Sequence, residues 1–184
     1  VINRWRIGLI GFLWACSYMS FAAGQQSRAV EAQRSLAESR GHEVIRYRVM
    51  PTLGNTVVWR SIYETPDGRL HADAIRTGLP FVGEISIREG SSITIARPDE
   101  VALPPGADEV MVRDRLRRFS HFADGYLVVL PAAEPGTILV GDARYSLATA
   151  GFEPLWGLRI SRGETRWAGP IMDRRAAGVS PSSA

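Results

Sequence analysis

The feature that most constrains this chain is an apolar run near its N-terminus, which begins at Ile7 and ends at Ala23. The run contains no charged side chain, and Arg4 and Arg6 lie directly before it. As a helix it would measure about 25 Å, close to the ~30 Å hydrocarbon core of a bilayer. The residues that follow must therefore fold as a domain that is attached to a membrane or exported across one.

Two interpretations of this run remain open. In the first it is a membrane helix, with Trp5 at the interface and Arg6 extended toward the head groups. In the second it is a cleaved secretory signal, because the small residues Ser20 and Ala22 occupy the two positions that a signal peptidase inspects. A buried core helix is disfavoured by the leading arginines. Both main interpretations place the following domain outside the cytoplasm.

Composition excludes several classes of function. The net charge is +3, and all 22 basic residues are arginines. A charge this mild does not indicate a nucleic-acid partner. The one cysteine, Cys16, lies inside the apolar run, so the rest of the chain has no thiol for a disulfide, a nucleophile or a metal ligand. The chain begins at Val1 rather than at a methionine, which is expected of a GTG start or of a fragment.

Three segments are predicted: a membrane helix with a helical stalk at 1–40, an extramembrane α+β domain at 41–172, and a disordered tail at 173–184 rich in Ser, Ala and Pro. Five residues that recur at helical spacing predict that the helix continues past the run, and Gly41 is placed to end it. These residues are Ala29, Val30, Gln33, Leu36 and Ala37.

The domain shows a succession of strand patterns around one convincing helix. Asp108 is placed to cap this helix and Gly125 to end it. Pro66-Asp67-Gly68 predicts one hairpin, and Glu89-Gly90-Ser91 predicts a second. Strands are expected at 43–49, 56–64, 70–76, 84–88, 93–95, 126–130, 137–140, 144–148, 155–160 and 165–168. The expected fold is α+β: an N-terminal membrane helix and one mostly antiparallel sheet with a single packed helix.

Several short motifs recur in a characteristic order. They are Arg40-Gly41-His42, Pro51 with Asn55 and Trp59-Arg60, Phe119-Ser120 with Gly125-Tyr126, GDARYS at 141–146, and PLWG at 154–157. Together they resemble the C-terminal part of the LexA-binding, inner membrane-associated hydrolases, a bacterial family also described as membrane-bound metal-dependent hydrolases. The similarity covers almost the whole chain, and residues 7–23 correspond to the last membrane helix of the family.

This resemblance implies a single-pass protein of the bacterial inner membrane with a periplasmic domain. It also implies a divalent metal in full-length members, whose histidine and aspartate residues lie in earlier membrane helices that this sequence does not contain. The catalytic residues of this chain therefore stay unassigned, and a membrane protein partner is expected to supply the missing helices. The alternative is a non-catalytic envelope binding or assembly module, anchored or secreted after signal cleavage. No residue supports contact with LexA, since an extracytoplasmic domain would not meet a cytoplasmic repressor.

The candidate ligand-binding residues are Arg60, Asp142, Arg144 and Tyr145. Asp142 and Arg144, with Arg60 from the sheet, are expected to form a buried ion pair or, with Tyr145, to line a polar pocket. The architectural interpretation is the simpler one, because Arg-carboxylate pairs fix structure at least as often as they bind ligands.

The three histidines form no metal signature in the sequence. His71 and Asp73 share one face of a predicted strand, which permits a metal or an acid-base pair but is typical of an exposed polar face. His121 and Asp124 are neighbours near a helix end, where a histidine complements the helix dipole. His42 is interpreted as a loop residue. No metal site is predicted.

Overall fold

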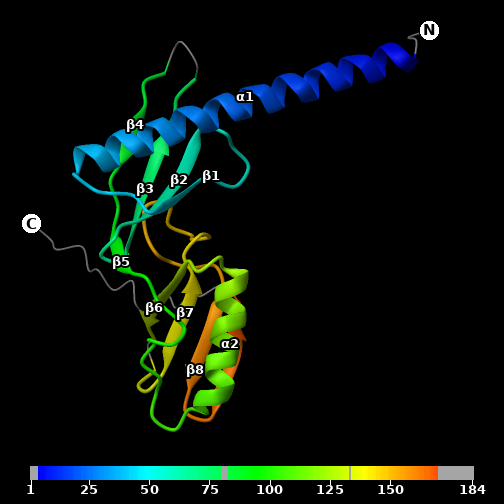
Figure 1. Ribbon diagram of the computed structural model, residues 1–184. Coiled ribbons are helices and arrows are strands. Elements are labelled where there is room, and N and C mark those ends of the chain that lie inside the picture. Colours follow the sequence, from blue (N-terminus) through cyan, green and yellow to red (C-terminus); the bar gives the residue numbers. More distant parts are fainter. Residues whose placement is uncertain (1–3, 80–82, 133, 170–184) are drawn as a thin grey trace, which may run out of the picture.

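The computed structural model describes residues 4–79, 83–132 and 134–169. Within them the chain forms two helices and nine strands, and the strands make two antiparallel sheets. The predicted α+β fold class, with a long apolar helix at the N-terminus, is confirmed. Figure 1 shows this helix crossing one face of the first sheet and projecting well beyond it. The tail predicted from residue 173 lies outside the described residues.

Helix α1 (Arg4–Ser39) is long and apolar enough to cross a membrane. None of its most apolar stretch is buried in the protein. The helix ends as predicted, because Gly41 has a φ of +69° and donates its N–H to the Glu38 carbonyl while His42 donates to that of Ala37. The C-terminal half of α1 is buried against the first sheet through Gln25, Ala29, Ala32, Gln33, Leu36 and Ala37.

The first sheet, sheet A, has the strand order β1-β2-β3-β4, and β5 also pairs with β3. Its strands are β1 (Arg46–Pro51), β2 (Val58–Glu64), β3 (Arg69–Arg76), β4 (Ser86–Arg88) and β5 (Ser92–Thr94). The predicted hairpin between β2 and β3 is confirmed. The hairpin predicted at 89–91 is wrong, because β4 and β5 both run antiparallel to β3 and do not pair with each other. Gly90 joins them, and a Cβ there would clash with the carbonyl oxygens of Ala72 and Ala150.

The second sheet, sheet B, has the order β6-β7-β8-β9. Its strands are β6 (Leu127–Pro131), β7 (Ile138–Asp142), β8 (Gly157–Ser161) and β9 (Glu164–Ala168). The expectation of one sheet is therefore corrected, since strand patterns do not reveal which strands pair. The strand predicted at 144–148 is also wrong. The chain turns there because Arg144 folds back on Asp142, and only Ser146 makes an isolated bridge, with Pro154.

Helix α2 (Glu109–Phe122) covers sheet B and matches its prediction. The Asp108 carboxylate accepts a hydrogen bond of 3.1 Å from the Met111 N–H, and Gly125 has a φ of +71° just past the helix. Its buried stripe packs on sheet B through Val112, Leu116, Phe119 and Ala123.

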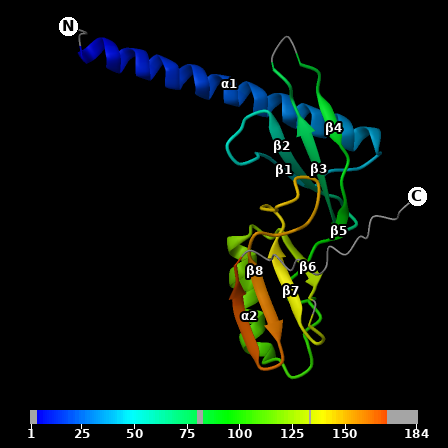
Figure 2. The ribbon, with the colours of Figure 1, turned by 180° about the vertical axis from the view of Figure 1, so that it is seen from behind.

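Three apolar clusters connect the layers. The first lies between α1 and sheet A, and the second lies between the other face of sheet A and β6. The third lies between sheet B and α2. Figure 2 shows the same arrangement from behind, with sheet B and α2 on the side of sheet A away from α1. Sheet A is therefore covered on both faces, which explains why all of β2 from Trp59 onward is buried.

Candidate functional site

Two of the predicted site residues form a buried ion pair at the end of β7. The Asp142 carboxylate is buried and accepts hydrogen bonds from Nε of Arg144 at 3.0 Å and from its terminal nitrogen at 2.8 Å. The Arg144 backbone N–H and Nε1 of Trp156 also donate to it. This hydrogen bonding to Asp142 raises the pKa of Arg144. The pair closes the turn that follows β7, as an architectural ion pair would.

Tyr145 lies beside this pair on the surface. Its ring is 4.9 Å from that of Trp156, and the Arg144 guanidinium lies 5.4 Å from its centroid. The structure thus brings Asp142, Arg144 and Tyr145 together. Both carboxylate oxygens of Asp142 are already engaged by the protein. Assignment of the three residues to ligand binding stays a prediction.

Arg60 does not join Asp142 in an ion pair, contrary to that expectation. Its guanidinium donates instead to the carbonyl oxygens of Ala143, Ala148 and Thr149, at 3.0, 2.8 and 2.7 Å. The side chain is 4% exposed, and burial without a carboxylate partner lowers the pKa of Arg60 to about 10. Arg60 therefore ties β2 to the loop after β7. The Asp142 carboxylate is instead paired with Arg144, which lies two positions later at the turn.

The structure also assembles a cluster of polar side chains where α1 ends on sheet A. His42 lies 4.5 Å from His71 between ring centroids, and His71 stacks on Tyr63 at 4.9 Å. The Tyr63 hydroxyl lies 2.9 Å from Nδ1 of His42. Only part of this cluster had a sequence signal, namely the shared face of His71 and Asp73. The approach of His42 depends on how α1 lies on the sheet.

A buried Arg-carboxylate pair supports this cluster. Arg40 donates to both oxygens of Asp73, at 2.8 and 2.9 Å, and to the Tyr63 hydroxyl at 2.8 Å. The hydrogen bond with Asp73 raises the pKa of Arg40, and burial raises that of Tyr63. The Gly90 N–H donates a further hydrogen bond to Asp73. The cluster therefore joins the end of α1, two strands and the step between β4 and β5.

Acidification is expected to destabilise the domain through His71. Burial, together with the charges of His42 and Arg40, lowers the pKa of His71. The unfolded chain therefore takes up a proton at a higher pH than the folded chain, and the free energy of unfolding falls as the pH drops below about 6.5. Urea unfolding at about pH 7.5 and about pH 5.5 should show a smaller loss for His71→Gln than for the unchanged chain. Equal losses would contradict this assignment.

Metal-ligand geometry is not found in the described structure. Within residues 4–79, 83–132 and 134–169, no group of three or more His, Cys, Asp or Glu side chains is placed to hold a metal ion. Asp73 is engaged by Arg40, and Asp124 by Arg48, so neither forms the pair with a nearby histidine that the sequence permits. The side chains of these clusters donate and accept hydrogen bonds.

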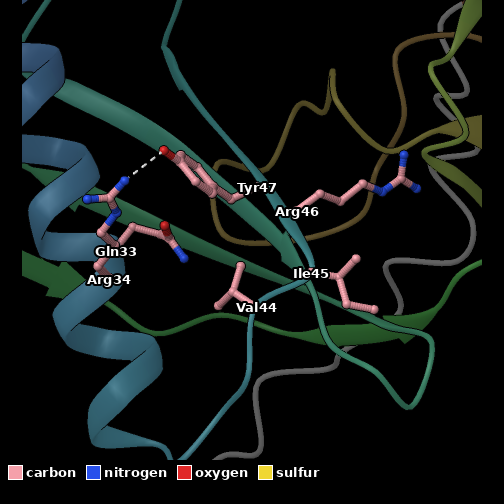
Figure 3. A pocket seen from close by; sticks show the side chains of 6 residues that line it. All are labelled: Gln33, Arg34, Val44, Ile45, Arg46 and Tyr47. Atoms are coloured by element: carbon pink, nitrogen blue, oxygen red, sulfur yellow. Dashed lines mark hydrogen bonds between the residues drawn. The ribbon is translucent and has the colours of Figure 1, made fainter.

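Two surface cavities lie on sheet A. One, of about 440 Å³, is bounded by β3, β4 and the loop residues 148–151. Arg60 donates hydrogen bonds to the carbonyl groups of Ala148 and Thr149 in this loop. The other, of about 430 Å³, lies between α1 and the start of β1 and is lined by Gln33, Arg34, Val44, Ile45, Arg46 and Tyr47 (Figure 3).

Comparison of the chain with protein-family models, with curated proteins and with solved structures finds no match. The class of the protein is therefore defined by its own fold: an α+β domain of two antiparallel sheets that carries a potential membrane-spanning helix at its N-terminus.

Proposed function

We propose that this chain is the membrane-anchored extramembrane domain of a bacterial inner-membrane metal-dependent hydrolase. In this proposal the domain binds and positions, and the catalytic residues belong to membrane helices outside this sequence. The observation that carries the proposal is the continuity of α1, which runs unbroken from its apolar stretch into its packing on sheet A. A domain joined in this way is held at a fixed place on the membrane surface.

The contact between α1 and the domain begins almost directly after the apolar run. Nε2 of Gln25 donates a 2.6 Å hydrogen bond to the Gly78 carbonyl, and Arg28 donates to that of Gly83 at 3.2 Å. Ala29 is then fully buried against sheet A. No flexible linker separates the anchor from the folded unit, which suits a role in positioning.

A second candidate, an envelope binding or assembly module that works without a hydrolase, is favoured by the way the polar clusters are used. Asp73, Asp142 and Arg60 all make internal contacts that stabilise the fold. Such a module differs from the first candidate only in its partner.

The intact mass of the protein from the membrane fraction, combined with protease treatment of spheroplasts, tests the anchoring. We expect a full-length mass, a digestible domain and a protected N-terminal helix. Replacement of Ala22 by Leu provides a control, since it removes the small residue required by a signal peptidase and should leave the mass unchanged apart from the substitution. A mature mass that begins at Ala23 would contradict anchoring, and a domain protected inside spheroplasts would contradict the periplasmic orientation.

A further inference from the structure

Strand β1 forms one edge of sheet A. It pairs with β2 on one side, and the described residues place no strand on its other side. Thr52 donates to the Val58 carbonyl, in register with the β1–β2 ladder. In an antiparallel strand, the backbone N–H and C=O groups of alternate residues point toward the paired strand. Those of Tyr47 and Val49 therefore point away from β2, to the free edge. Pro51 is the next residue at this spacing, and because its nitrogen also faces the free edge, its lack of an N–H costs the β1–β2 ladder no hydrogen bond.

A groove lies beside the N-terminal part of this edge. The cavity of about 430 Å³ lies between α1 and residues 44–47, and Figure 3 shows the side chains of Gln33, Arg34 and Tyr47 on its two sides. Tyr47 and Ile45 are exposed hydrophobic residues of its wall. A helix beside a free strand edge is an arrangement into which an extended peptide fits.

Gln33 provides an independent sign of a missing partner. It is 0% exposed, yet neither Nε2 nor Oε1 of its side chain has a hydrogen-bond partner. A buried polar group that is left without a hydrogen-bond partner destabilises the fold. A carboxamide donates and accepts at once, which matches the N–H and C=O groups of a peptide backbone.

The charges at the edge favour an acidic partner. Arg34 is exposed, and its guanidinium contacts only the Tyr47 hydroxyl, at 3.3 Å, with no salt bridge in the described part of the chain. Antiparallel pairing of two copies in the register centred on Arg48 would place two Arg48 side chains opposite each other, which is unfavourable for like charges. The register centred on Val49 would place Arg48 opposite Met50, so a second copy is an outcome that the test below must distinguish.

We propose that an extended acidic peptide segment of a partner protein adds a strand to β1 in the groove beside α1. Tyr47 and Val49 would exchange backbone hydrogen bonds with it, Gln33 would pair with its backbone, and Arg34 would meet one of its carboxylates. This inference rests on the proposed function in that it names the partner class of the same membrane-held domain.

The test uses the full chain in lipid nanodiscs and a phage-displayed library of random linear peptides, counter-selected against the Tyr47→Pro variant. We expect enrichment of acidic sequences with alternating apolar residues. A synthetic copy of the most enriched peptide should bind at least about tenfold more weakly to Tyr47→Pro, which removes an outward N–H, than to Tyr47→Ala, which keeps it. Arg34→Glu should weaken binding by a similar factor.

Hydrogen exchange keeps the proposal testable if Tyr47→Pro misfolds. The Tyr47 and Val49 amides of the unchanged chain should exchange more slowly once the synthetic peptide is bound. No enrichment, equal binding to the proline and alanine variants, or unchanged exchange would overturn the proposal. So would a dimer cross-linked through β1, which would assign the edge to a second copy. Peptide binding does not depend on which side of the membrane the domain occupies, so failure here is distinguishable from failure of the localisation test.

Discussion

Asp73→Ala is expected to lower the free energy of unfolding by about 3–5 kcal/mol, because it leaves the largely buried Arg40 guanidinium without its carboxylate. The substitution also removes the acceptor of the Gly90 N–H and so loosens the step between β4 and β5. Urea unfolding of the full chain in mild detergent, followed by near-ultraviolet circular dichroism, measures this change. The signal reports tertiary packing of aromatic side chains, including Tyr63, whose hydroxyl accepts a hydrogen bond from Arg40.

Two controls separate the buried pair from a surface effect. Glu89 also accepts from Arg40 but is 70% exposed, so Glu89→Ala should cost less than about 1 kcal/mol. The double variant Arg40→Met with Asp73→Leu should be more stable than Asp73→Ala alone, because no unpaired buried charge remains. A cost for Asp73→Ala as small as that for Glu89→Ala would show that the pair does not hold α1 on sheet A.

Arg60→Ala is expected to destabilise the domain by about 3 kcal/mol, since three carbonyl oxygens lose their donor and each hydrogen bond contributes about 1 kcal/mol. Arg60→Lys should recover only part of this, because an ammonium group cannot span three acceptors as the planar guanidinium does. Arg88→Ala is the matched control. Arg88 is exposed at the cavity that residues 148–151 help to line, and its replacement should change stability by less than about 0.5 kcal/mol.

The same Arg60 variants decide between architecture and ligand binding. We expect amide hydrogen exchange at 143–149 to accelerate in Arg60→Ala, because this segment loses its attachment to β2. If exchange and unfolding stay unchanged, the guanidinium is not structural, and its assignment to ligand binding gains weight.

Features encoded by neighbouring residues were predictable from the sequence. The cap at Asp108, the stop at Gly125 and the end of α1 at Gly41 each depend on one residue with a defined backbone role. Nine of the ten expected strands were found for the same reason, although their bounds shifted by a few residues, and the one expected at 144–148 is a turn. Pairing was not predictable, because β4 and β5 are joined by Gly90 in a way that resembles a turn in sequence and continues along β3 in space.

The difference between local and long-range contacts also explains which parts of the candidate site were predictable. Asp142 and Arg144 are two positions apart, so their contact had a local signal. Arg40 and Asp73 are 33 positions apart and meet only because α1 lies across β3. For the same reason, the sequence indicates a loop at His42 but not its contacts with Tyr63 and His71. The pairing of Arg60 with carbonyl groups had no signal either, since backbone acceptors are the same at every position.

Helix α1 passes through Gly24 without a break, so a continuous helix joins the anchor proposed here to sheet A. Rotation of α1 about its own axis in the bilayer by one residue position, about 100°, would turn the free edge of β1 through the same angle. The neighbour that packs on residues 7–23 inside the membrane would then determine the direction in which the groove faces. Contacts inside the membrane would in this way set the direction of peptide binding outside it.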